Sequence, residues 1–419
     1  MIWTTHKLSA IAELTLGKML DQKKNKGEPR PYLANVNVRW GSFDLSDLRE
    51  MRFEPHEAER YGLRVGDIVM CEGGEPGRCA LWKGDVPGTM LQKALHRVRA
   101  RQGVDARFLF YSLFAKGRAG ELEYLFTGAT IKHLPSEQLA KVTVQLPPPG
   151  EQLRIASILG AYDDLIEVNR RRIAVLEEMA RRLFEEWFVR VAAGTATDDG
   201  EGPLPTGWSM QRLGELIQLD KGVSYSGDGL TPDGDPLVNL KNILAGGGFR
   251  TDGLKWYSGE VKARHCVVPG DLVMANTDLT PSGGVIGNAA LVPMIDRAGR
   301  IAITHHLFAV RPLGGSPVGR HYLCQWLNSP RFKSYARGHA NGATVLGLRA
   351  DSVLAHRTLV PPPALAKRFE DFASSSYVLA QNLVRANQQL AASRDLLLPR
   401  LISGDLPATA AERELEAAA

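Results

Sequence analysis

The sequence predicts an α+β chain built as two copies of one unit, each a globular domain of short strands followed by a long helix. A Gly-Ala-Thr turn precedes a triple proline twice, at Gly128 and Pro147 and again at Gly342 and Pro361. The spacing between copies is constant, because 342 − 128 = 214 and 361 − 147 = 214. A long helical pattern follows each proline run. We therefore expect two globular domains related by pseudo-two-fold symmetry and separated by two long antiparallel, coiled-coil-like helices.

Composition sets wide bounds on the function. A chain of 419 residues is too long for one ordinary core, and 44% hydrophobic with 23% charged residues is typical of a folded protein. The net charge of +5 permits a polyanionic partner but excludes little. The four cysteines have no zinc-site spacing, which favours a reduced cytoplasmic compartment. We find no signal-peptide pattern and no run near the roughly 18 apolar residues of a membrane span.

Both copies carry the same strand and turn signals. In each copy a predicted strand contains an asparagine at an equivalent place, and a later Gly-Asp turn leads into a second apolar strand. Glycine and proline are dense between the strands, so the loops are many, and loops on a strand scaffold often carry recognition. The matched segments are Pro31–Val38 with Pro236–Ile243, which hold Asn37 and Asn242, and Val65–Met70 with Pro269–Met274.

The helix after the first triple proline has a heptad seam, because its apolar positions alternate in steps of four and three. The seam runs through Ile155, Leu159, Tyr162, Ile166, Asn169, Ile173, Leu176, Ala180, Leu183 and Trp187. Asn169 could fix the register against a polar partner group. The second helix, 364–398, has a weaker seam and is expected to end at Pro399. Its seam positions are Phe369, Phe372, Ser376, Leu379, Leu383, Ala386, Leu390, Ser393 and Leu397.

The economical arrangement is an antiparallel pair of these two helices within one chain. The alternative is two separate surface helices, each packed on its own domain.

Four segments with helical patterns resemble those of a known protein family. They are Gln152–Leu159, Asp163–Arg170, Leu183–Phe188 and Leu398–Leu406. With these segments the chain resembles the specificity subunit of type I restriction–modification enzymes over its whole length. The second copy departs from the pattern, because Leu365-Ala366 stands where the first copy has Glu151-Gln152.

The resemblance implies a domain plan. It consists of a first target-recognition domain over 1–149, a spacer helix over 150–191, a linker over 192–206, a second recognition domain over 207–363, a second spacer helix over 364–405 and a flexible tail over 406–419.

The resemblance also implies a function without catalysis by this chain. Each recognition domain would read one half of a bipartite target in double-stranded DNA, and the helix pair would set the gap. Two modification subunits would use S-adenosylmethionine to methylate adenine, and restriction subunits would use ATP and Mg to translocate and cleave. We expect no cofactor or metal on this chain, no membrane contact, and a place in the bacterial or archaeal cytoplasm.

The residues agree with a non-catalytic role. No GxxxxGK[ST] phosphate loop is present, and Asn328-Ser329-Pro330-Arg331 fails the Asn/Asp-Pro-Pro-aromatic pattern of amino-methyltransferases. Two alternatives stay open. One is an autonomous metal-dependent nuclease, whose carboxylates and lysine would be Asp233, Glu260 and Lys262 beside Pro232. The other is a coiled-coil scaffold without a role in DNA binding.

Candidate DNA contacts are polar and basic residues near loops of both copies, since cations bind phosphates and polar side chains read base edges. His305 and His306 should point to opposite faces of a strand, so we expect one of them to face DNA and neither to bind a metal. Ordinary turns and solvated lysines are the alternative. The candidates are Lys23, Lys24, Lys26, Gln92, Lys93, Thr130, Lys132, His133, Asn276, Thr277, Thr304, His305, His306, Arg337, Asn341 and Thr344.

Overall fold

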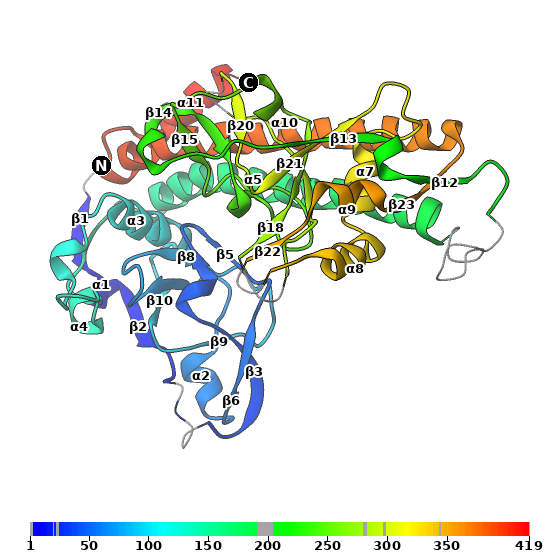
Figure 1. Ribbon diagram of the computed structural model, residues 1–419. Coiled ribbons are helices and arrows are strands. Elements are labelled where there is room, and N and C mark those ends of the chain that lie inside the picture. The colour runs from blue at the N-terminus through cyan, green and yellow to red at the C-terminus, as the bar shows by residue number, and fades with distance from the viewer. Residues whose placement is uncertain are drawn as a thin grey trace. The chain divides into compact units, whose positions relative to one another are not determined.

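The computed structural model describes residues 3–19, 21, 25–190, 204–279, 283–295, 299–342 and 345–418. The chain divides into two compact units, and each contains part of both long helices. Unit 1 comprises Met1–Val168 and Ala386–Ala419, and unit 2 comprises Asn169–Arg385. Figure 1 labels the elements. No helix in the described part of the chain has the length and apolar character needed to cross a membrane.

Unit 1 is built on a four-stranded antiparallel sheet in the order β2-β10-β7-β8. A two-stranded sheet, β1-β11, joins the two ends of the globular part, and β3 lies between antiparallel β6 and parallel β9. The strands are β1 (Thr4–Lys7), β2 (Ala12–Leu16), β3 (Glu28–Leu33), β4 (Val38–Arg39), β5 (Ser42–Phe43), β6 (Arg49–Phe53), β7 (Ile68–Cys71), β8 (Cys79–Leu81), β9 (Met90–Leu91), β10 (Leu95–Ala100) and β11 (Thr143–Leu146).

The helices of the globular part of unit 1 are α1 (Leu8–Ile11), α2 (Glu57–Tyr61), α3 (Ala106–Arg118) and α4 (Ser136–Leu139). Helix α3 begins where the Asp105 carboxylate accepts a hydrogen bond from the Phe108 N–H at 2.8 Å, a typical N-cap. Its apolar residues from Phe108 to Phe114 are buried in the main core of the unit.

Unit 2 repeats this topology. Its four-stranded sheet has the order β13-β21-β17-β19, β12 pairs with β23, and β14 lies between antiparallel β15 and parallel β20. The strands are β12 (Ser209–Arg212), β13 (Ile217–Lys221), β14 (Leu230–Val238), β15 (Lys255–Tyr257), β16 (Cys266–Val267), β17 (Leu272–Ala275), β18 (Thr277–Asp278), β19 (Ala289–Leu291), β20 (Ile301–Ile303), β21 (Leu307–Pro312), β22 (Leu346–Gly347) and β23 (Arg357–Val360). The helices are α7 (Arg320–Leu327), α8 (Pro330–His339) and α9 (Ala350–Ala355). The repeat and the α+β class are confirmed.

The matched asparagines perform the same local task in both units. Asn37 and Asn242 are buried, and each lies in a 3₁₀ turn rather than in the strand that the sequence predicts. The Asn37 amide oxygen accepts from Ala34 N–H at 2.9 Å, and the Asn242 oxygen accepts from Asn239 N–H at 2.9 Å. These side-chain bonds to the backbone compete with strand pairing and end β3 and β14 early.

The two long helices are α5 (Pro149–Phe184) and α10 (Pro363–Ser403). Helix α5 continues into a π-helical turn over Glu185–Val189. The expectation that Pro399 ends the second helix is wrong, because α10 runs through it. Proline removes one backbone donor, but burial of Leu398 and Leu401 in the core holds the last turn in place.

Within each unit the two helices pack together. In unit 1 the early part of α5 meets the late part of α10, where Asn387 donates to Ile166 O at 3.4 Å and Arg394 pairs with Asp163. In unit 2 the late part of α5 meets the early part of α10, where the rings of Phe188 and Phe369 lie 5.2 Å apart. Helices that pair early with late in both units run antiparallel, as the seam predicts.

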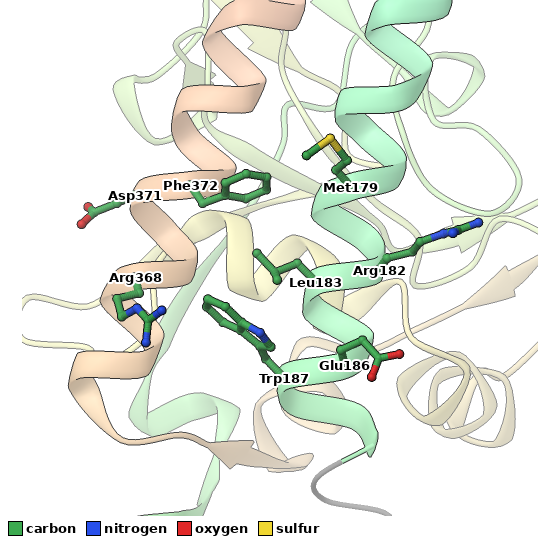
Figure 2. A pocket seen from close by; sticks show the side chains of 8 residues that line it. All are labelled: Met179, Arg182, Leu183, Glu186, Trp187, Arg368, Asp371 and Phe372. Carbon is green, nitrogen blue, oxygen red and sulfur yellow. The ribbon is translucent and has the colours of Figure 1, made fainter.

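Every seam position of α5 is buried or half-buried, so the heptad pattern identified the packed face correctly. The α10 seam is wrong at Leu379, which is 49% exposed, and at Ser393, which is also exposed, while Ala380 is 4% exposed. The small residues Ala373 and Ala380 occupy the buried row instead, which shifts the packed face by one position. Figure 2 shows the unit 2 end of the pair, where Leu183, Trp187 and Phe372 line a hollow of about 690 Å³.

The structure forms a helix where the sequence analysis expects a flexible tail over 406–419. Helix α11 covers Ala408–Ala418 and buries Ala408 and Ala411 in the core of unit 1. Its first N–H, on Ala408, donates to the Glu151 carboxylate at 3.1 Å. An acceptor with negative charge at a helix N-terminus stabilises the helix, so Glu151 favours helix formation in this short segment.

Gln152, the residue after Glu151, also anchors the start of α5. It accepts from Asp105 N–H at 2.8 Å and donates to Pro147 O at 2.9 Å, so it joins the start of α5 to the cap of α3. In unit 2 the corresponding Leu365 and Ala366 pack in the apolar core instead. The two copies therefore attach their helices by different means.

Candidate nucleic-acid interface

Three loops of unit 1 meet at one end of the four-stranded sheet. The Glu72 N–H, just after β7, donates to Ala94 O at 2.8 Å, and the Leu134 N–H donates to Glu72 O at 2.7 Å. Gly73 also forms an isolated β-bridge with His133. We name residues 72–73, 92–94 and 127–133 loop cluster 1. It brings together the predicted residues Gln92, Lys93, Thr130, Lys132 and His133.

The turn 127–133 is closed at its base. Thr127 N–H donates to His133 O at 2.8 Å, and His133 N–H donates to Thr127 O at 2.9 Å. Gly128 has φ +95°, and a Cβ there would lie 2.2 Å from Ile131 O, so only glycine fits. This closure leaves Thr130 and Lys132 exposed to solvent. The turn thus presents a hydroxyl and a cation outward.

Ala94 marks strained backbone inside loop cluster 1. Its φ is +85°, and it is the one non-glycine residue with positive φ in the described part of the chain. A side chain in this conformation costs about 1 to 2 kcal/mol, and such strain is often found at functional sites. The sequence analysis missed Ala94, because alanine rarely adopts a positive φ and its presence therefore gives no hint of this conformation.

Unit 2 repeats the arrangement. Asn276 N–H donates to His306 O at 3.0 Å, and Leu348 N–H donates to Asn276 O at 2.8 Å. Asn341 and Gly347 exchange backbone bonds of 3.0 and 2.8 Å, as Thr127 and His133 do in unit 1. We name residues 276–278, 304–306, 341–342 and 345–347 loop cluster 2. It brings together Asn276, Thr277, Thr304, His305, His306 and Asn341.

The prediction that the two histidines point to opposite faces of a strand is wrong. His305 and His306 lie in a turn, and their rings contact each other with centroids 3.9 Å apart. His306 Nδ1 lies 2.8 Å from Thr277 Oγ1. Burial lowers the pKa of His306, and the neighbouring His305 and lysines lower it further, so the neutral ring is favoured.

Two candidates are buried and hold the loops rather than face a ligand. Asn276 is 2% exposed and donates through its amide to His305 O at 3.1 Å. Thr304 is fully buried, and its Oγ1 has no hydrogen-bond partner in the part of the chain that the structure describes. The sequence alone does not distinguish these buried polar residues from polar residues that are exposed to solvent.

The other candidates lie outside the loop clusters. Lys26 is exposed and precedes β3, and Arg337 is exposed on α8 with its Nε 3.3 Å from Gly283 O. Lys23, Lys24 and Thr344 lie outside the described residues.

The nuclease alternative gains no support from the geometry. Asp233, Glu260 and Lys262 are exposed loop or strand residues. Across the described ranges, one group of three potential metal ligands occurs elsewhere, at Glu54, His56 and Glu57. The Glu57 carboxylate already accepts a hydrogen bond from Lys18 Nζ at 2.5 Å, so the lysine ammonium group balances its negative charge.

Comparison with known proteins shows which family the chain resembles. Residues 2–178 match the family model described as the type I restriction modification DNA specificity domain. The type I restriction enzyme MjaIX specificity subunit of Methanocaldococcus jannaschii is 21% identical over 425 residues, covering 96% of this chain and 93% of the relative. The chain is therefore similar to type I specificity subunits over almost its whole length.

Two further similarities point to the same family. The MjaVIII specificity subunit of the same organism is 24% identical over 180 residues, which are 42% of this chain and 41% of the relative. The crystal structure of a type I restriction-modification S subunit from M. genitalium has the same fold, with a TM-score of 0.52, 16% identity and 96% of each chain covered. These similarities support a function in DNA sequence specificity.

Proposed function

We propose that the chain is a type I specificity subunit that reads a bipartite duplex target, with one half read by the globular part of each unit. The observation that carries the proposal is the repetition of the same three-loop cluster, with the same backbone bonds, in both units. The recognition domains would be 1–149 and 207–363. Loop clusters 1 and 2 would provide the side chains that face the grooves.

Within each cluster the exposed or half-buried polar residues are the candidates for base contacts. In cluster 1 these are Gln92, Lys93, Thr130, Lys132 and His133, and in cluster 2 they are Thr277, His305, His306 and Asn341. Side chains at the tips of rigidly closed turns can be placed accurately against base edges.

The helix pair would set the gap between the two half-sites. The continuous buried seam of α5 supports this, because a packed helix pair keeps a fixed length of about 1.5 Å per residue. The flanks of the same helices would hold two modification subunits. Those subunits would bind S-adenosylmethionine and methylate adenine, and restriction subunits with ATP and Mg would complete the complex in the cytoplasm.

An exchange of one recognition domain tests the proposal. Residues 207–363 would be replaced by the corresponding segment of a relative with a different target, and the methylated motif would be determined by sequencing. We expect one half of the motif to change and the other half and the gap to stay the same. The reciprocal exchange of residues 1–149 is the matched control and should change the opposite half. A change in both halves after either exchange would contradict one half-site per unit.

A further inference from the structure

Helix α8 of unit 2 carries positive charge that no carboxylate in the described part of the chain neutralises. Its ten residues include Arg331, Lys333 and Arg337 and no acidic side chain. Arg331 and Arg337 are exposed, and Lys333 is half-buried. Among the residues that the structure describes, none of the three forms an ion pair with a carboxylate. His339, also exposed, ends the helix with its ring stacked 3.9 Å from Tyr335.

The positive charges on α8 lower the pKa values of neighbouring basic groups. Burial, followed by the charge of Arg337, lowers the pKa of Lys333. Arg331 and His339 add to the burial that lowers the pKa of His356 beneath the helix. Uncompensated like charges on one helix destabilise each other, so an anion bound at this surface would relieve the repulsion.

The corresponding segment of unit 1 lacks this property. Subtracting 214 places Gly117, Ala119 and Glu123 opposite Arg331, Lys333 and Arg337. This offset is structurally valid, because it also relates Thr127 and His133 to Asn341 and Gly347, which make the same bonds. The neighbouring Lys116 pairs with Glu121 at 2.9 Å. The basic surface is therefore a feature of unit 2 alone and not of the shared fold.

The basic surface adjoins loop cluster 2. Arg337 Nε donates to Gly283 O at 3.3 Å, and a Cβ at Gly283 would meet both Leu346 Cδ1 and Arg337 Cγ within 4 Å. The buried face of α8, through Phe332 and Ala336, packs in the same core as Leu346. The cations thus lie on a fixed helix beside the loops, and Figure 1 shows α8 next to β18 and β22.

We propose that α8 binds the sugar–phosphate backbone of duplex DNA next to the half-site read by unit 2, through Arg331, Lys333 and Arg337. The inference rests on the proposed function, and it adds an asymmetry, because unit 1 has no equivalent contact. Phosphate contacts of this kind fix the position of the protein on the duplex and carry no sequence information.

The test compares the wild-type complex with a triple variant, Arg331→Gln, Lys333→Gln and Arg337→Gln. Binding to a random-sequence duplex is measured by fluorescence anisotropy between about 50 and 200 mM salt, since phosphate contacts also govern non-specific binding. Each lost contact should reduce the slope of log K against log[salt] by about 0.9, so the triple variant should lose between 2 and 3 units, roughly. Affinity near 0.1 M salt should fall by about tenfold or more.

Two controls separate charge from folding. Lys116→Gln removes an ion-paired cation from the corresponding segment of unit 1 and should leave the salt slope unchanged. Arg331→Lys with Arg337→Lys keeps the charge and should keep most of the slope. The thermal midpoint of the triple variant should equal or exceed that of the wild type, because like-charge repulsion has been removed.

The outcomes are distinct. A wild-type complex that binds no duplex at any salt concentration would defeat the proposed function itself. A wild-type complex that binds, with a triple variant of equal slope, would overturn the role of α8 and leave the proposed function standing. A triple variant that keeps the slope but loses its partner subunits would instead assign the basic surface to an acidic protein face.

Discussion

At the residue scale, His356 shows how the two copies diverge inside one architecture. It occupies the place of Val142, because the Leu213 N–H donates to His356 O as the Leu8 N–H donates to Val142 O. His356 is 5% exposed, its ring lies 4.4 Å from that of Tyr335, and its Nε2 has no partner within the described residues. A buried imidazole that lacks a hydrogen-bond partner lowers the stability of the folded state, and the valine of unit 1 has no such cost.

The histidine should make stability depend on pH. Burial, then Arg331 and His339, lower its pKa to about 4 from 6.5. The unfolded chain therefore binds a proton between these values and the folded chain does not, so stability is complete above about pH 6.5 and declines as pH falls toward 4. We expect His356→Val to recover up to about 3 kcal/mol of this acid loss. Thermal midpoints from pH 7.5 to pH 4.5 check it, and equal pH slopes for both proteins would refute it.

At the scale of elements, the terminal helix α11 depends on a residue more than two hundred and fifty positions earlier in the chain. Glu151 is 7% exposed, and its carboxylate accepts a hydrogen bond from the first N–H of the helix. The second copy has Leu365 at this position. The sequence difference between the copies is thus explained by a helix that needs a cap in unit 1.

Removing this cap should release α11. We expect Glu151→Ala to cost about 1 to 2 kcal/mol of local stability, because a capping acceptor with charge is lost. Hydrogen exchange of residues 408–418 should accelerate, while exchange in β10 stays slow. Glu137→Ala, an exposed carboxylate on α4, is the matched control and should change neither. Unaltered protection of α11 in the Glu151 variant would show that apolar packing alone orders the helix.

At the scale of the whole molecule, local patterns predicted the architecture and the contacts between distant segments decided the rest. The 214-residue offset and the α5 seam need only the sequence, so the repeat and the antiparallel helix pair could be predicted. Loop cluster 1 could not, because it forms through bonds between Glu72, Ala94 and Leu134, which belong to separate loops. Likewise, no local pattern shows that Leu379 faces solvent or that a turn brings the two histidine rings together.

The measurement that tests the central claim most directly is methylome sequencing of a host that expresses the modification subunit proposed as the partner, with and without this chain. We predict a two-part methylated-adenine motif that appears only when the chain is present. Methylation that is the same in both hosts would contradict the claim that this chain selects the DNA target.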